Sequence, residues 1–434
     1  MSAVSTIRER IAPLHERLEV IHGLGDMFTG CFLNTLETTV QAIAPGDTFV
    51  ITGDIEAMWL RDSTAQVMHY LRFCNDPEVA TLIEGLIARQ AACILIDPYA
   101  NAFNLTDSGR HCFQDEPVQS GHVWERKYEI DSLCYPVWLA WRYYEATGHT
   151  TFLTEKFHQA LASILEVFTC EQHRENSSYW FRRADCPPQD TLSHNGKGAP
   201  VAYTGMTWSG FRPSDDACVY GYLIPSNLFA AKVMDCVERF AGLLGDPILA
   251  KTAARLRGEI RAGLDAYASV VHPVFGDIYA YETDGLGHYV LMDDANVPSL
   301  LSLPYLGVCD SNDEKYLRTR RFVLSEENPY FNTGKTAEGV GSPHTPGGYV
   351  WPISLCMQIM TSDDDDEAAR LLRMLLTTHA GTCLMHESFD PDDPASYTRS
   401  WFAWANSMFG EMMYRLYESG RLDKVLRLTG MTSV

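Results

Sequence analysis

The chain has 434 residues, of which 46% are hydrophobic and 21% are charged, and its formal net charge is −22. These proportions are typical of a globular protein and exclude an intrinsically disordered chain. The negative charge, together with the lack of a cluster of Lys and Arg, excludes a nucleic-acid backbone as the partner.

Helical periodicity dominates the chain from its first residues. Apolar residues recur at helical spacing from Ile7 to Ile21, and the pattern returns after Asp76-Pro77, where a cap precedes a proline suited to a first helical position. In chain order, helices are predicted over residues 5–22, 25–43, 62–74, 77–97, 130–147, 150–171, 216–243, 246–268, 312–324, 349–361, 364–379 and 400–418. Many of them form adjacent pairs with short connections.

Strand patterns are sparse. Residues 179–185 predict one strand, and residues 274–284 and 288–293 predict a hairpin. Because regular alternation of strands and helices is missing, Rossmann and TIM-barrel folds are disfavoured. Residues 184–214 and 325–348 lack a helical pattern, and loops of that length in a compact domain are usually functional.

The arrangement of predicted helices favours one closed architecture. No Ser/Gly-rich or charged linker separates two cores, so we expect a single domain over residues 1–434. Paired helices in one domain are typical of an all-α fold, the (α/α)6 barrel, with a few short β-hairpins in the loops. In such a barrel, the loops of the inner ring surround one pocket.

The segment TGDIEAMWLRDSTAQV, residues 52–67, is the first candidate for binding. Asp62 could simply cap the following helix, and Arg61 could form a plain ion pair with it. A sugar is the functional alternative, since Arg61 and Asp62 can bind vicinal hydroxyls and Trp59 can cover the apolar face of a ring.

The segment TWSGFRPSDDACVYGYLIPSN, residues 207–227, contains Trp208, Arg212, Asp215 and Asp216 before an apolar run. The aspartates could serve the start of a helix. Alternatively, one of them is an acid that protonates a leaving oxygen, with a pKa raised by burial or by its neighbour.

Glu387 and His386, in HESF, are followed by an aspartate-rich stretch and by two tryptophans, Trp401 and Trp404. Most glutamates are exposed and have no chemical role. A second carboxylate from the 215–216 pair changes the interpretation, because two carboxylates that face one sugar-sized gap are the minimum for glycosidic cleavage.

Three further segments are open to more than one interpretation. His344, in EGVGSPHTPGGYVWPIS, could be a structural histidine or a ligand of a hydroxyl, and no GK[ST] follows its glycines, which excludes a phosphate loop. Residues 293–296, DDAN, could cap a helix or line a pocket. The run DDDDE at 363–367 suggests a metal site, but it is better explained as the acidic start of an exposed helix.

The same strings resemble glycoside hydrolase family 125, the exo-acting α-1,6-mannosidases. The matching strings are GDIEAMWLRDSTAQV, SGFRPSDDACVYGYLIPSN, DDANVPSLLSLPYLG, GVGSPHTPGGYVWPIS, HESFDPDDP and SYTRSWFAWANSMFGE, between about residues 50 and 412. The resemblance implies an (α/α)6 barrel and an inverting enzyme that needs neither a metal nor a cofactor.

The resemblance also implies roles for single residues. By this resemblance, Glu387 takes the place of the family's general base, and either Asp215 or Asp216 takes the place of its general acid. Asp215 is slightly favoured, because Asp216 could serve the start of the following helix. Trp59, Arg61 and Asp62 would line the subsite for the terminal mannose, with His344 nearby. Trp208, Arg212 and His386 complete the predicted substrate-binding residues. The expected partners are α-1,6-linked mannosides.

Rival functions remain open at this point. A non-catalytic mannoside-binding module would need the aromatic residues but not two opposed carboxylates. Another (α/α)6 carbohydrate enzyme is a further alternative, either a sugar epimerase or a different exo-glycosidase. Epimerases of this shape use pairs of histidines, and we find no such pair in the chain. A metal-dependent cyclase would depend on DDDDE.

The cysteines and the N-terminus bear on location. The twelve cysteines contain no CxxC pair, which argues against a zinc or iron–sulfur site. Apolar surroundings such as those of Cys93 and Cys356 favour buried free thiols. The first 18 residues show no apolar core of a signal peptide, and we identify no stretch of about 20 apolar residues for a membrane span. We therefore expect a cytoplasmic protein without a membrane partner.

Overall fold

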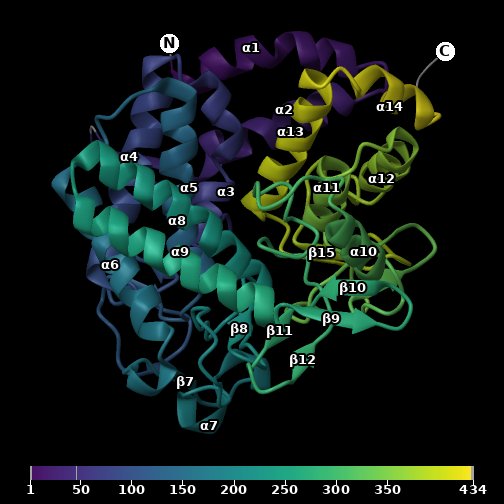
Figure 1. Ribbon diagram of the computed structural model, residues 1–434. Helices are drawn as coiled ribbons and strands as arrows, with labels where there is room; N and C mark the ends of the chain where they lie inside the picture. Colours follow the sequence, from purple (N-terminus) through teal and green to yellow (C-terminus); the bar gives the residue numbers. More distant parts are fainter. Residues whose placement is uncertain (1, 45, 432–434) are drawn as a thin grey trace.

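The computed structural model describes residues 2–44 and 46–431 (Figure 1). Its helices are α1 Ala3–Leu18, α2 Leu24–Asn34, α3 Leu60–Ala65, α4 Pro77–Ile96, α5 Ile130–Thr147, α6 Glu155–Glu171, α7 Ser193–Gly196, α8 Ile224–Leu244, α9 Pro247–Tyr267, α10 Glu314–Val323, α11 Pro352–Met360, α12 Asp365–Thr377, α13 Ala403–Glu418 and α14 Leu422–Leu428. Every helix predicted from periodicity is present, and α7 and α14 were not predicted.

Differences in burial divide the helices into two rings. Helices α3, α5, α8, α11 and α13 are buried on almost every side; in α11, eight of nine residues are buried. Helices α9 and α12 bury one face and expose the other, as expected of helices on the outside of a core. The all-α fold is therefore the predicted (α/α)6 barrel, with an inner and an outer ring.

The inner ring contains one irregular segment. Residues 301–307 form tight turns instead of a helix, and they are largely buried. The ring of Tyr305 packs on Trp138 of α5, and its hydroxyl donates a hydrogen bond of 3.0 Å to Glu411 of α13. This segment therefore lies between α5 and α13, two inner helices that are distant in the sequence.

Neighbouring helices pack in pairs, and the two ends of the chain close the ring. Helix α8 runs alongside α9, and α2 packs on α13, so the N-terminal and C-terminal parts lie together in Figure 1. Arg17 of α1 donates a hydrogen bond of 2.6 Å to Asp423 of α14. This contact joins the first and the last helix.

Capping explains where several helices begin. Asp76 and Asp246 accept hydrogen bonds from backbone N–H groups of α4 and α9. The run DDDDE does the same for α12, since Asp364 accepts from the N–H groups of Asp366 and Glu367. Its neighbour Asp365 pairs with Arg421 at 2.7 Å. The explanation of this run as the acidic start of a helix is confirmed.

The strands are short and lie in the connections between helices. They are β1 Val40–Ala44, β2 Asp47–Val50, β3 Met58–Trp59, β4 Ala102–Phe103, β5 Asp115–Glu116, β6 Val123–Glu125, β7 Arg182–Arg183, β8 Tyr222–Leu223, β9 Ser269–His272, β10 Gly276–Tyr279, β11 Glu282–Thr283, β12 Tyr289–Val290, β13 Phe331–Thr333, β14 Glu338–Val340, β15 Ser388–Phe389 and β16 Tyr397–Thr398. The described strands form two- and three-stranded antiparallel sheets.

The predicted hairpin is only partly correct. Strand β11 pairs with β12, with Glu282 opposite Val290, as expected. The expected single strand over 274–284 is divided, because β10 pairs instead with β9 and β11 also pairs with β8. The same pairing removes residues 216–223 from the helix predicted over 216–243, which begins at Ile224. Strands β9 and β10 form a local hairpin, whereas β8 pairs with a strand far along the chain, and that distant pairing overrides the local pattern.

Helix α4 corrects one expectation about membranes. By length and composition alone it is apolar enough to cross a membrane, although no such stretch was identified in the sequence. More than half of this apolar stretch is buried inside the protein, where α4 packs on α5 and α6. The core helix of a soluble protein has these same properties, so α4 is weak support for a membrane span.

The twelve cysteines are all free in the described part of the chain. Seven of them are buried, including Cys93 and Cys356, and burial raises the pKa of the Cys93 thiol to about 12. These thiols pack as small apolar groups in the core.

Two helical glycines give a direct test of the packing between the rings. Replacing Gly410 of α13 with alanine should destabilise the protein by about 1–3 kcal/mol, because the new Cβ would lie 2.9 Å from the Cα of Phe32 in α2. Replacing Gly258 of α9 should instead stabilise it by about 0.5–1 kcal/mol, since nothing lies within 4 Å. Urea denaturation measures both changes. Equal midpoints for the two variants would contradict the close contact between α2 and α13.

Candidate active site

The segments that precede the inner helices converge on one cavity of about 250 Å³. Segments before or at the start of α3, α11 and α13, the turn at 213–215 and Asn296 all contribute to it. Its lining comprises Thr52, Ile55, Trp59, Arg61, Asp62, Pro213, Ser214, Asp215, Asn296, His344, Thr345, Pro346, Trp351, Glu387, Thr398, Arg399, Phe402 and Trp404. Aromatic rings alternate here with charged groups, as expected of a site that binds the apolar faces and the hydroxyls of a sugar.

A strained turn presents Asp215 to the cavity. Its backbone adopts a left-handed conformation, with φ of 66°. The N–H of Asp215 donates to the carbonyl of Arg212 at 2.9 Å, and the N–H of Arg212 donates to the carbonyl of Asp216 at 2.7 Å. Lys127 Nζ donates to the carbonyl of Asp215 at 2.7 Å. Such strain in a non-glycine residue is found preferentially at functional sites.

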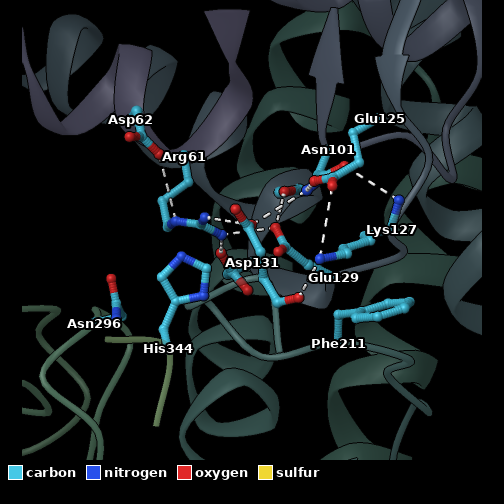
Figure 2. Close-up of polar contacts among 12 residues, drawn as sticks. Arg61, Asp62, Asn101, Glu125, Lys127, Glu129, Asp131, Phe211, Asn296 and His344 are labelled. Atoms are coloured by element: carbon cyan, nitrogen blue, oxygen red, sulfur yellow. Dashed lines mark hydrogen bonds and ion pairs between the residues drawn. The ribbon is translucent and has the colours of Figure 1, made fainter. Parts of the chain in front are cut away.

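Arg61 lies at the centre of a group of carboxylates, which Figure 2 shows in close-up. Its guanidinium is 2.6 Å from Glu129, 3.1 Å from Asp131, 3.1 Å from Asp215 and 3.5 Å from Asp62. These acids come from α3, from the start of α5 and from the turn at 213–216. Because carboxylates surround its guanidinium, Arg61 organises these acids. It also lines the cavity, so its role in binding the sugar stays a prediction.

Crowding and burial change the protonation of these acids. Burial raises the pKa of Asp62 and that of Asp131 to about 6 each. Burial also raises the pKa of Glu129 well above its usual range. For Asp215 burial acts in the same direction, but the charge of Arg61 and a hydrogen bond with Glu129 outweigh it and lower the pKa. At neutral pH Glu129 is therefore the member of the group that keeps a proton, whereas Asp62 and Asp131 are mostly ionised.

Glu387 lines the same cavity as Asp215, Arg61 and Asp62. It lies one residue before β15 and is only 6% exposed. Arg399, at the far end of β16, places Nη1 3.7 Å from Glu387 Oε1 and also pairs with Asp54. The backbone of Arg399 has a positive φ of 39°. Glu387 is thus a buried carboxylate in a pocket and not a surface acid.

His344 provides a positive charge in the lining of the cavity. Its Nδ1 is 3.1 Å from Asp216 Oδ1. Burial lowers the pKa of His344, but the hydrogen bond and charge of Asp216, with the charges of Asp215 and Glu387, raise it overall to about 9. His344 is therefore an imidazolium at neutral pH and can donate to an oxygen in the cavity through its other nitrogen.

The structure separates the two candidate acids. Asp215 lines the cavity and its side chain is 20% exposed, whereas Asp216 is 1% exposed and lines a neighbouring hollow together with Arg212. Asp216 is held by His344 on one oxygen. Of the two, Asp215 is the one that shares the cavity with Glu387.

Four predicted substrate-binding residues, Trp59, Arg61, Asp62 and His344, line the cavity, and three do not. Trp208 is buried at 1% exposure under Arg174, whose Cζ is 4.0 Å from the ring centroid. Arg212 is held by Glu282 at 2.6 Å. His386 points away from its neighbour in the sequence and stacks on Tyr397 with ring centroids 3.7 Å apart.

Several residues that line the cavity or contact Arg61 were not assigned a role from the sequence. Residues 293–296 were expected either to cap a helix or to line a pocket. Asn296 lines the cavity, whereas Asp293 accepts hydrogen bonds from the N–H groups of Leu300 and Leu301. Arg399 and the acids Glu129 and Asp131 were missed. The signal for the two acids was present, because YEIDS places Glu129 and Asp131 at the start of an apolar helix, as WLRDS places Asp62.

The lining is poorly suited to a metal ion. Among the residues that the structure describes, His15, Glu19 and Asp26 are the one group whose ligand atoms could surround an ion, and none of them lines the cavity. Glu19 already accepts hydrogen bonds from the N–H groups of Gly23 and Gly25.

Comparisons with known proteins agree with this geometry. The profile of the metal-independent α-mannosidases (GH125) matches residues 22–414. The meiotically up-regulated gene 157 protein of Schizosaccharomyces pombe is 40% identical over 437 residues, which cover 95% of this chain and 86% of that protein. A metal-independent α-mannosidase structure from Streptococcus pneumoniae, a non-productive complex with α-1,6-mannobiose, is 45% identical with a TM-score of 0.93, covering 95% of this chain and 98% of that one.

More distant structures share the fold alone. The glucoamylase of Saccharomycopsis fibuligera has a TM-score of 0.58 at 12% identity, covering 93% of this chain and 95% of that one. This enzyme is an (α/α)6 glycosidase, so the comparison confirms the predicted fold class. With the family profile over most of its length and a close relative at 45% identity, the chain is a glycoside hydrolase that belongs to family 125, the metal-independent α-mannosidases.

Proposed function

We propose that the chain is an exo-acting, inverting α-1,6-mannosidase that uses Asp215 as general acid and Glu387 as general base. The observation that carries the proposal is that both carboxylates line one small cavity, together with aromatic rings suited to a sugar. The relative from Streptococcus pneumoniae, bound to α-1,6-mannobiose, supports the choice of linkage.

The size of the cavity favours an exo enzyme. A volume of about 250 Å³ is at the lower limit of small-molecule pockets, which typically measure about 300–1,000 Å³. A space of this size suits one terminal sugar with its aglycone directed outward. A long mannan chain passing through the site would need an open cleft instead.

The mechanism follows from the positions of the two acids. Asp215 gives a proton to the glycosidic oxygen while the bond to the anomeric carbon breaks. Glu387 takes a proton from a water molecule that attacks the same carbon from the opposite face. Inversion needs room for that water, and it therefore requires the carboxyl groups to be about 6.5–9.5 Å apart when the substrate is bound. His344 and Asp62 would hold hydroxyls of the sugar.

The test is proton NMR of the products from an α-1,6-mannobioside. The first mannose released should be the β-anomer, which then equilibrates to the usual mixture. Release of the α-anomer would overturn the inverting mechanism. Absence of mannose would overturn the function and favour a non-catalytic mannoside-binding module. A parallel reaction in EDTA should proceed at the same rate, since the family is metal-independent.

A further inference from the structure

Glu129 is a buried acid for which the mechanism above has no use. It precedes α5 and is 1% exposed. Its Oε2 accepts hydrogen bonds from Arg61 Nη1 at 2.6 Å and from Ser132 Oγ at 2.8 Å. Its Oε1 is buried and has no donor among the residues that the structure describes. A buried carboxylate oxygen without a donor is costly, so its surroundings require an explanation.

The carboxyl group of Asp215 provides that explanation. Glu129 and Asp215 are neighbours on the guanidinium of Arg61, where Glu129 Oε2 is 2.6 Å from Nη1 and Asp215 Oδ1 is 3.1 Å from Nη2. A hydrogen bond between the two carboxyl groups is among the causes that raise the pKa of Glu129. Two ionised carboxylates can only accept hydrogen bonds, so a bond between them requires a proton on one of the two. Glu129 and Asp215 therefore form a pair that shares one proton and titrates as a unit.

The surroundings of the pair are too poor in positive charge to neutralise every acid. Arg61 faces both members, and Lys127 reaches Asp215 through the backbone carbonyl. The charged and titratable groups around the pair are Arg61 and Asp62 of α3, Asp131 of α5, Lys127, Cys218, and His344 with its partner Asp216. Asp62, Asp131 and Asp216 add further negative charge nearby. A proton held between Glu129 and Asp215 therefore removes one negative charge from this crowded region.

We propose that Glu129 is a positioning residue that stores, next to Asp215, the proton that Asp215 delivers to the leaving sugar. This inference deepens the proposed function and rests on it. In the empty enzyme the proton resides on Glu129, because Glu129 is fully buried while Asp215 still contacts solvent. A bound mannoside excludes that solvent, which makes the charged form of Asp215 costly. The proton then shifts to Asp215, and Arg61 stabilises the ionised Glu129.

The protons balance over one turnover. Asp215 gives its proton to the glycosidic oxygen, which keeps the electron pair of the broken bond, so the aglycone departs as a neutral alcohol. The water that attacks the anomeric carbon gives one proton to Glu387. Once the products leave, that proton returns through solvent to the pair of Glu129 and Asp215.

The test is the pH profile of Glu129→Gln on an α-1,6-mannobioside. Activity is lost as the pH rises to the value at which the pair of Glu129 and Asp215 gives up its last proton. Without Glu129, Arg61 and His344 favour an ionised Asp215, so the alkaline limb should move down by about 1–2 pH units and kcat at pH 7 should fall by about 10–100-fold. An alkaline limb at the wild-type pH would overturn the inference.

The matched control is Asp131→Asn. Asp131 contacts the same nitrogen of Arg61 at 3.1 Å, and burial raises the pKa of Asp131 against the charge of Arg61 and its hydrogen bond, which lower it. This variant should retain an alkaline limb within about half a pH unit of the wild type. Equal shifts in both variants would mean that Glu129 acts only through the ion pair with Arg61, which would contradict the inference.

A second substrate separates proton delivery from general damage. A 2,4-dinitrophenyl α-mannoside has an aglycone that leaves without protonation, so Glu129→Gln should hydrolyse it within about threefold of the wild type. A loss as large as that on the mannobioside would indicate a structural role and overturn the inference. If the wild-type protein hydrolyses neither substrate, the proposed function fails instead, and the two failures are thus distinguishable.

If Glu129→Gln does not fold, Ser132→Ala replaces it. Ser132 donates to Glu129 Oε2 and thereby stabilises the ionised form of Glu129. Its loss should make the last proton of the pair harder to remove, which moves the alkaline limb to higher pH, opposite to the effect of Glu129→Gln. A limb that stays in place or moves to lower pH would overturn the inference.

Discussion

Replacing Glu387 with glutamine should reduce mannose release from an α-1,6-mannobioside by about 10³–10⁴-fold, at the upper end of what a general base contributes. The amide cannot take a proton from the attacking water. The change should leave the fold intact, because the nearest charged partner, Arg399 Nη1, is 3.7 Å away and glutamine has the same shape. Steady-state kinetics and a thermal melt of the same preparation measure both effects.

A control for this variant is Asp390→Asn, three residues further along the chain. Asp390 accepts a hydrogen bond from the N–H of Asp392 and does not line the cavity. Its kcat should remain within about twofold of the wild type, as expected of a surface change. Glu387→Gln with more than a tenth of wild-type activity would remove Glu387 from the mechanism. A melting temperature well below that of the wild type would make the loss uninformative.

The helices could be predicted from the sequence because their signal is local. Apolar residues at helical spacing mark the face that each helix buries, and caps such as Asp246 and Asp364 mark where several begin. The expected run at 216–243 shows the limit of this approach. Tyr222 and Leu223 of this run pair with β11 instead, and a partner so far along the chain leaves no trace in the local pattern.

The cavity could be predicted only in part. Asp62, Glu387 and His344 were identifiable because polar groups stood beside aromatic or glycine-rich stretches before a helix. Trp208 has the same sequence context but lies in the core, where a Cβ on Gly221 would approach its Nε1 to 1.8 Å. Nothing local distinguishes a tryptophan that faces a sugar from one that packs against glycine and under an arginine.

Glu129 was missed for a related reason. Acids at the start of a helix are usually explained by capping or by the helix dipole, so YEIDS appeared ordinary. The importance of Glu129 depends on Arg61 and Asp215, which lie 68 residues before it and 86 residues after it in the chain. Only the folded barrel brings the three side chains together, and only there does the unpaired oxygen of Glu129 become visible.

Comparing Asp215→Asn with Asp216→Asn identifies the general acid. Asp215→Asn should lower kcat on the mannobioside by about 10²–10⁴-fold, because asparagine cannot protonate the leaving oxygen. On a 2,4-dinitrophenyl α-mannoside the loss should be tenfold or less, since that aglycone needs no proton. The ratio of the two losses, measured as kcat for each substrate, is the diagnostic quantity.

Asp216→Asn should behave differently, because Asp216 lies behind His344 and faces the neighbouring hollow. Its carboxylate is what holds the pKa of His344 at about 9. With an amide there, His344 becomes neutral over more of the pH range and binds the sugar less well. The loss should therefore appear in KM and be of similar size for both substrates, because no proton donor has been removed. If Asp216→Asn instead lost activity on the mannobioside alone, Asp216 would be the acid and Asp215 the residue that positions it.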